Sequence, residues 1–240
     1  MKTIRTLALA TALSLSIPAG GAFAQALSRD VGVPLQEAQS LASRGQLSAA
    51  AAKVRAARSA ADTSAERRKV TEMSAYVNTA ARNYSAAASD LASIGAPASR
   101  LAPLYYQAEN YDKAIELGRQ MGGTNGLKIV AQSYIKTGNS AEAAKIYQDL
   151  IDQNGPQVEY LENLASAQFK MDDKQAYLQT IERLIRADPQ PMRWRALLNN
   201  LKGESLTRDS KLALYKLLVE RDKITRPEDY VEFAKFATVA

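Results

Sequence analysis

Apolar residues recur at helical spacing in short blocks along most of the chain, and polar turns separate the blocks. The pattern is clearest over residues 126–189, where GLKIVAQSYIKTGNSAEAAKIYQDLIDQNGP is followed, after one residue, by VEYLENLASAQFKMDDKQAYLQTIERLIRADP. Apolar positions of the first copy return in the second, as Leu127 does in Leu161. In each copy, a polar turn (KTGNS or KMDDK) splits the apolar positions into two groups with the period of an α-helix. The pattern therefore predicts two short amphipathic helices per copy, joined as a hairpin.

Less regular copies flank this pair. Small residues that mark the first helix of each copy lie at Ala38, Ala75, Ala102 and Ala131. The intervals between them are unequal, and those from Ala75 to Ala102 and from Ala102 to Ala131 are the short ones. Shortened helices or turns would explain these intervals. Pro103 lies inside one predicted helix, which it should kink or begin late.

Two further segments extend the pattern toward the C-terminus. RWRALLNNLKG and DSKLALYKLLVERD predict a fifth hairpin, and TRPEDYVEFAKFATVA begins another helix, in which Thr225 and Glu228 have the spacing of a capping box. A plain helical bundle is the alternative for the irregular copies.

The clearest copy resembles the tetratricopeptide repeat. The resemblance depends on a small residue, a tyrosine three residues later and a glycine four residues beyond it, followed by a small and an aromatic residue in the second helix: Ala131, Tyr134, Gly138, Ala143 and Tyr147. Small alanines let paired helices approach closely, and a glycine tolerates the left-handed backbone that ends a helix. The resemblance implies an all-α fold, a right-handed α-solenoid of antiparallel helix hairpins. It covers most of residues 31–240 and is clearest at 124–156 and 158–190.

A solenoid of this kind leaves an extended concave surface, and in the tetratricopeptide family the first helix of each pair lines it. We therefore expect partner-binding residues among the first-helix positions that are not needed for packing. These are Tyr106, Lys128, Gln132, Ile135, Lys136, Glu162, Ser166, Phe169, Lys170, Arg195, Asn199 and Lys202. The alternative for Phe169 is that it packs against the next repeat.

Composition restricts the chemistry. The 240 residues include no cysteine and no histidine, which excludes disulfides, thiolate metal sites, cysteine nucleophiles and imidazole bases. The net charge of +6 is spread along the chain, and its densest basic segment is ERRKV at 66–70. A nucleic-acid-binding protein would need a concentrated basic face, so we interpret this segment as a solvated helix start.

Residues 1–24 have the form of an export signal. Lys2 and Arg5 precede the apolar run TLALATALSLSIP, and AGGAFA then ends in an Ala-x-Ala sequence. We expect cleavage after Ala24, with residues 25–240 forming one helical repeat domain. The apolar run is far shorter than the ~20 residues needed to span a bilayer, and no later segment is apolar enough to do so. The sequence thus predicts a soluble periplasmic protein.

Several short segments resemble catalytic or ligand-binding motifs, but their residues do not meet the requirements of those sites. SYIKTG at 133–138 combines Ser-x-x-Lys with Lys-Thr-Gly, as in penicillin-binding enzymes, but Lys136 would have to serve in both. MGGTNG at 121–126 lacks the Gly-Lys-Ser/Thr of a phosphate loop and fits helix termination. Asp172 and Asp173 suit a polar turn, with too few oxygen ligands nearby for calcium. Glu159 and Glu162 lie three residues apart on one face, as an acid pair or as part of a peptide-binding face.

These observations predict a periplasmic adaptor or scaffold without catalytic residues, cofactor or metal. Its expected partner is a protein or peptide of the cell envelope, held in the concave groove. Two alternatives stay open: the helical superstructure of an envelope enzyme of the lytic glycosidase type, or a structural subunit of a secretion or polysaccharide-export complex. The sequence gives neither the identity of the partner nor the oligomeric state.

Overall fold

A computed structural model describes residues 27–188, 212, 215–216, 219–220 and 227–237. Its helices are α1 (Arg29–Ser43), α2 (Leu47–Ala60), α3 (Ser64–Ala80), α4 (Tyr84–Ser93), α5 (Ala98–Gln107), α6 (Tyr111–Met121), α7 (Gly123–Lys136), α8 (Ser140–Asn154), α9 (Val158–Lys170), α10 (Lys174–Ala187) and α13 (Pro227–Ala237). No β-strand occurs among the described residues. The all-α prediction is confirmed, and α13 confirms the helix expected near the C-terminus.

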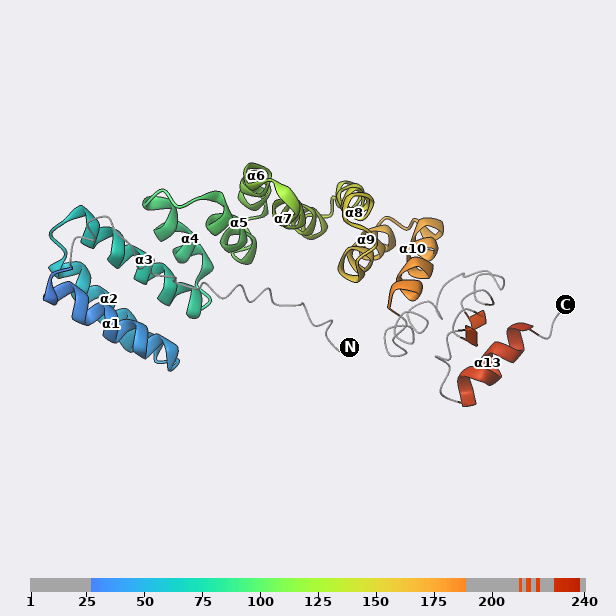
Figure 1. The fold of residues 1–240 in the computed structure, drawn as a ribbon, viewed down its shortest axis with the longest axis horizontal. Coiled ribbons are helices and arrows are strands. Elements are labelled where there is room, and N and C mark those ends of the chain that lie inside the picture. Colours follow the sequence, from blue (N-terminus) through green and yellow to red (C-terminus); the bar gives the residue numbers. More distant parts are fainter. Residues whose placement is uncertain (1–26, 189–211, 213–214, 217–218, 221–226, 238–240) are drawn as a thin grey trace.

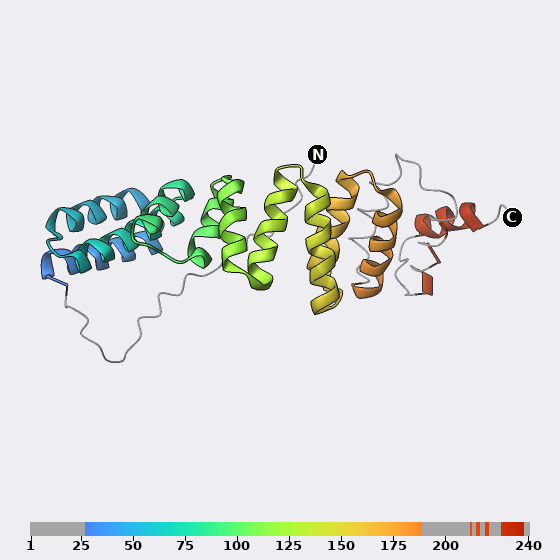
Figure 2. The same ribbon diagram turned by 90° about the horizontal axis from the view of Figure 1, so that it is seen from above.

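The helices form a row of hairpins (Figures 1 and 2). Each helix from α1 to α10 packs on the next one along the chain, and α1 also contacts α3, as α5 contacts α7. The row is bowed, and α7 and α9 lie on its inner side relative to α6 and α8 (Figure 1). The predicted solenoid of antiparallel helix hairpins is therefore confirmed.

The turn inside each hairpin repeats one backbone feature. A residue with positive φ ends the first helix of every pair from α1/α2 to α9/α10: Gly45, Arg82, Glu109, Gly138 and Asp172. In three hairpins the residue that follows caps the second helix with its side chain, which accepts a backbone N–H: Asn83, Asn110 and Asp173. Five residues after each left-handed position comes a buried residue of the second helix: Ala50, Ala87, Ala114, Ala143 and Tyr177.

This turn shows that the irregular copies are true repeats. Every left-handed position follows the small residue of its own first helix at the same interval, as Gly45 follows Ala38 and Glu109 follows Ala102. Short helices account for the two short intervals between copies, because α4 and α5 have 10 residues each and α6 has 11, whereas α8 has 15. A plain bundle, the alternative for this region, does not have such a translational repeat.

The apolar core is divided along the row into three clusters. One lies in α1–α3, a second is formed mainly by α3–α5, and the third and largest extends from α7 to α10 and includes Tyr215. Ala131, Ala143 and Tyr147 of the clearest repeat are 0 % exposed. This arrangement is typical of a repeat protein, in which each unit buries its apolar surface only against its neighbours.

Glycines make the junction between α6 and α7. Gly122 alone connects the two helices, with φ 66°. Within the helices Gly118 and Gly126 face each other so closely that a Cβ atom on Gly126 would lie 2.3 Å from the Gly118 carbonyl oxygen. MGGTNG therefore ends one helix, as predicted, and also begins the next.

Pro103 neither delays nor interrupts its helix. α5 begins five residues earlier, at Ala98, and continues to Gln107. The late start that the sequence suggested is therefore wrong. Leu101, Ala102 and Leu104 are all buried, so packing offsets the backbone hydrogen bond that a proline removes.

Other predictions lie outside the described residues. They are the export signal with its cleavage after Ala24, most of the fifth hairpin, the Thr225 cap and the binding residues Arg195, Asn199 and Lys202. In the part of the chain that is described, no helix has the length and apolar character needed to cross a bilayer.

Candidate functional site

The first helices α7 and α9 belong to successive hairpins and are joined by two polar contacts. Near their N-terminal ends the Lys128 Nζ lies 2.6 Å from a Glu159 carboxylate oxygen. Near their C-terminal ends the Lys170 Nζ donates to the backbone carbonyl of Ile135, at 3.1 Å. These contacts connect equivalent helices of neighbouring repeats, and so they define one continuous face. We call it the α7–α9 face.

Three residues predicted to bind a partner are engaged in the fold of this face. The Lys128 side chain is only 17 % exposed and is paired with Glu159. One proton of Lys170 is used by the Ile135 carbonyl, and Ile135 itself is half-buried against the third core cluster. Glu159 is therefore not one half of a free acid pair with Glu162, because its carboxylate balances a lysine.

A buried polar group lies beneath the face. Tyr147 of α8 is 0 % exposed, and its hydroxyl makes no hydrogen bond of good geometry with a described residue. Burial raises the pKa of Tyr147, and the Glu159 carboxylate and Tyr106 raise it further, while the nearby Gln132 side chain lowers it. Glu159, Tyr106 and Gln132 thus all act electrostatically on one neutral hydroxyl.

Tyr106 marks the α5 side of this group. Its ring packs edge-on against Tyr111 of α6, with centroids 5.8 Å apart. Burial raises the pKa of Tyr106, and Tyr111 adds to the effect. Tyr106 is half-buried, and its ring packs against the second helix of its own hairpin.

The remaining predicted residues of the α7–α9 face are wholly or partly exposed, and Glu162 also interacts within the fold. Lys136, Glu162, Ser166 and Phe169 are exposed, and Gln132 is half-exposed. Phe169 is 58 % exposed, and its ring lies 5.7 Å from that of Tyr177 in the second helix of its own hairpin. An exposed phenylalanine with one aromatic neighbour is suited to anchor a bound protein.

Sequence reasoning missed two members of the site. The residues predicted to bind a partner include neither Tyr147 nor Glu159, although a peptide-binding face was one alternative for the pair Glu159 and Glu162. One signal was available for Glu159, because it lies three residues before Glu162, which takes the same place in its first helix as Lys128 takes in the preceding one. The Tyr147 hydroxyl gave no such signal, since its surroundings depend on how three helices meet.

The catalytic-looking SYIKTG segment is the end of a helix. Ser133 is 0 % exposed, and its hydroxyl donates to the Ile129 carbonyl at 2.7 Å. Lys136 is exposed, and the Thr137 hydroxyl donates back to the Ser133 carbonyl. A serine buried in this way is not available to a base at Lys136.

The turn that contains Asp172 and Asp173 also has a structural role. Asp172 pairs with Lys174 across the α9/α10 turn. The described residues contain no acidic cluster that could hold a metal ion. The turn therefore joins two helices and, in the part of the chain that is described, offers no cation site.

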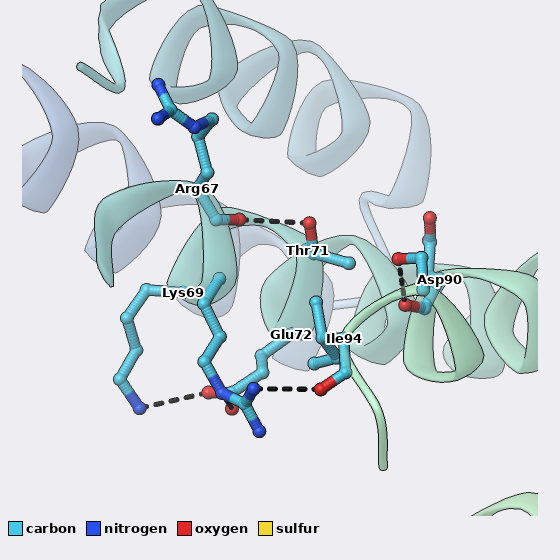
Figure 3. A network of polar contacts seen from close by, with 8 residues as sticks. Arg67, Lys69, Thr71, Glu72, Asp90 and Ile94 are labelled. Atoms are coloured by element: carbon cyan, nitrogen blue, oxygen red, sulfur yellow. Dashed lines mark hydrogen bonds and ion pairs between the residues drawn. The ribbon is translucent and has the colours of Figure 1, made fainter. Parts of the chain in front are cut away.

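The basic segment 66–70 is engaged within the fold as well (Figure 3). The Arg68 guanidinium donates to the Ile94 carbonyl at the end of α4, at 2.8 Å. Lys69 pairs with Glu72 at 2.9 Å, and Arg67 donates to the Asp62 carbonyl, also at 2.8 Å. These bonds stabilise the start of α3 and the neighbouring helix ends, in agreement with a structural interpretation of the segment.

Comparison with known proteins agrees with the repeat seen in the fold. A family model for the tetratricopeptide repeat matches residues 129–154, which include most of α7 and the whole of α8. A solved structure of Pseudomonas aeruginosa PilF is similar over 87 % of this chain and 92 % of its own, with 15 % identity and a TM-score of 0.43. No curated protein matches the sequence. The family model therefore confirms the resemblance over residues 129–154, in a chain that its fold shows to be a helical repeat protein.

Proposed function

We propose that this protein is a non-catalytic adaptor of the cell envelope, and that it binds a protein or peptide partner on its first-helix side. Tetratricopeptide domains generally bind proteins, and the repeat at 129–154 supports that role here. The export signal predicted at residues 1–24 supports a partner in the periplasm.

One observation carries the proposal. The α7–α9 face is built as a single surface by its two cross-repeat contacts, and yet it leaves Phe169 58 % exposed. Large apolar side chains at the centre of a binding surface usually become buried when a partner binds. The polar neighbours Gln132 and Ser166 can donate and accept hydrogen bonds without a change of charge.

The geometry of the α7–α9 face also argues against a catalytic role. Its serine and lysine candidates are separated, since Ser133 is buried while Lys136 is exposed. The Glu159 carboxylate is neutralised by Lys128. We infer that the α7–α9 face binds a partner and does not catalyse a reaction.

The test is partner capture with matched variants. The protein is crosslinked in its source cells and purified, and the amount of each recovered partner is compared for the natural chain, Phe169→Ala and Lys145→Ala. Lys145 is an exposed residue of the second helix α8 and serves as the control. We expect Phe169→Ala to lose at least one partner that Lys145→Ala retains, with unchanged helical circular dichroism for both. Equal recovery in all three would contradict the proposal.

A further inference from the structure

The junction between α6 and α7 lacks the apolar cluster that the other hairpin junctions have. At α2/α3, α4/α5 and α8/α9, a single cluster contains buried residues of both helices. At α6/α7 the apolar side chains divide instead: Leu117 of α6 packs on the cluster formed mainly by α3–α5, and Ala131 of α7 belongs to the cluster of α7–α10. Along the described row from α1 to α10, two hairpins therefore meet without a shared core cluster only here.

Where α6 and α7 cross, glycine replaces the side chains that would lock them together. A Cβ atom on Gly118 would lie 2.9 Å from a Val130 methyl group and 3.0 Å from the Gly126 carbonyl oxygen. Val130 is 2 % exposed and belongs to neither cluster. Packed helices normally resist rotation because ridges of side chains on one helix lie in grooves of the other. Two glycines form no such ridge, so their crossing can act as a pivot.

The connection between the two helices is also made of glycine. Gly122 alone separates them, with φ 66° and ψ −172°, a combination that essentially only glycine adopts. Gly123, the first residue of α7, has φ 59°. Successive glycines can absorb a change of φ and ψ at little steric cost, which is what a hinge requires.

A contact at the surface spans the junction beside the glycines. The Arg119 guanidinium, in the last turn of α6, donates to the Tyr134 hydroxyl of α7. Its central carbon lies 5.9 Å from the centre of the Tyr134 ring. Because Arg119 is exposed, water and salt weaken this contact. It can therefore limit a rotation of the helices without preventing it.

We infer that the α6/α7 junction is a hinge, about which α1–α6 and α7–α10 move as two bodies. The crossing of the two helices is the pivot, Gly122 absorbs the backbone rotation, and the contact between Arg119 and Tyr134 is a latch that favours the bowed form. Bending here changes the curvature of the row without opening an apolar cluster. Bending at another junction between hairpins in this row would separate buried residues of one cluster, which costs more.

The hinge separates residues predicted to bind a partner. Tyr106 lies in α5, whereas Gln132, Ser166 and Phe169 lie in α7 and α9. A partner that contacted both sides would select one curvature, since a ligand shifts a population toward the form that it binds best. This consequence rests on the proposed function, but the hinge itself does not, so it is tested on the protein alone.

Distances between spin labels measure the motion. The chain contains no cysteine, so pairs of introduced cysteines can be labelled specifically. One pair, at Ser89 of α4 and Lys145 of α8, crosses the α4/α5 and α6/α7 junctions. The matched control pair, at Ala52 of α2 and Glu116 of α6, crosses α2/α3 and α4/α5. All four residues are exposed and lie two positions after the buried alanine of their helix.

Pulsed electron paramagnetic resonance gives the distance distribution of each pair. We expect the Ser89–Lys145 distribution to be about twofold broader than the Ala52–Glu116 distribution, because only the first pair spans the hinge. Arg119→Ala should broaden the first distribution further and leave the second unchanged, with unchanged helical circular dichroism. Equal widths for the two pairs would overturn the hinge. Broadening of both pairs by Arg119→Ala, or of neither, would refute the latch. Loss of the hinge would leave partner capture through Phe169, and so the proposed function, unaffected.

Discussion

At the scale of single residues, the left-handed turn position is the feature that recurs most regularly. Glycine occupies it at Gly45 and Gly138, whereas Arg82, Glu109 and Asp172 adopt the same conformation with a side chain. A left-handed backbone costs an L-residue about 1–2 kcal/mol, which glycine avoids. The turns at Arg82, Glu109 and Asp172 thus keep this conformation at the expense of local strain.

Relief of that strain should stabilise the protein. Glu109→Gly is expected to raise the free energy of unfolding by about 0.5–1 kcal/mol, since the strain relieved exceeds the added chain entropy. The reverse change, Gly138→Ala, should lower it by about 1 kcal/mol. Urea unfolding followed by circular dichroism measures both. If both substitutions shifted stability in the same direction, the turn would not have the role assigned to it.

Two substitutions at Tyr147 separate the stability that its ring contributes from the stability that its hydroxyl contributes. The ring is fully buried, so Tyr147→Ala should cost about 3–5 kcal/mol. The hydroxyl lacks a partner of good geometry among the described residues, so Tyr147→Phe should cost less than about 0.5 kcal/mol. Urea unfolding of the two variants measures both losses. A loss above about 1.5 kcal/mol for the phenylalanine variant would mean that the hydroxyl is hydrogen-bonded in solution.

Glu66 makes the junction between the first two hairpins sensitive to acid. Its carboxylate accepts the Ser28 N–H at 2.9 Å and the Thr63 N–H at 3.1 Å, which joins the start of α1 to the start of α3. Hydrogen bonds, from Ser28 first and then from Thr63, lower the pKa of Glu66 from 4.5 to about 2. Because the pKa is lower in the folded state, this stabilisation is complete above pH 4.5 and is lost as the pH falls toward 2.

Glu66→Gln should therefore flatten part of the acid transition. We expect the variant to be less stable than the natural protein at neutral pH, and the difference to shrink between pH 4.5 and pH 2. Urea midpoints measured at intervals over this range provide the comparison. Parallel curves for the two proteins, with a constant offset, would show that Glu66 does not titrate with a lowered pKa.

At the scale of helices, neighbours are joined in two different ways. α6 and α7 meet through the backbones of Gly118 and Gly126. α7 and α9 meet through polar side chains at both ends, and a further bond joins α8 to α10, where the Arg183 guanidinium donates to the Gln148 amide oxygen at 3.4 Å. The glycine junction lies where the core is divided, between the cluster formed mainly by α3–α5 and the cluster of α7–α10.

The glycine junction should not tolerate a methyl group. Gly126→Ala would place a Cβ atom 2.3 Å from the Gly118 carbonyl oxygen, and forcing α6 and α7 apart should cost about 1–3 kcal/mol. Gly32→Ala is the matched control, because it lies within α1, where the nearest atom to the new Cβ is 3.7 Å away. The control should gain up to about 1 kcal/mol from helix propensity. Thermal and urea unfolding of both variants tests the difference, and a stabilised Gly126→Ala would contradict the close approach.

At the scale of the whole molecule, much of the architecture followed from the sequence. The return of apolar positions from one copy to the next predicted the hairpins of α7–α10, and Ala131, Gly138 and Tyr147 have the places that the resemblance implied. The start of α5 at Ala98, well before Pro103, was not predictable, because local preference disfavours it and packing overrides that preference. The engagement of Lys128 was missed for a similar reason, since a pair between repeats depends on the offset of two helices.

In the irregular repeats, a short pattern at the turn predicts the register of the helices better than the repeat length does. A left-handed residue followed by Asn, with a buried alanine four residues after the cap, is shared by the turns at 82–87 and 109–114. That short pattern gives the register directly, whereas matching to one fixed repeat length fails when α4, α5 and α6 are short.

The central claim, that a partner binds along the first helices, is tested most directly by photocrosslinking in the source cells. A crosslinking amino acid is placed in turn at Gln132, Ser166 and Phe169 on α7 and α9, and at Lys145 and Asp149 on the second helix α8, all accessible positions. The account predicts one shared crosslinked partner from the first three positions and none of it from the α8 positions. Crosslinks to that partner from α8 alone, or equally from both helix sets, would contradict it.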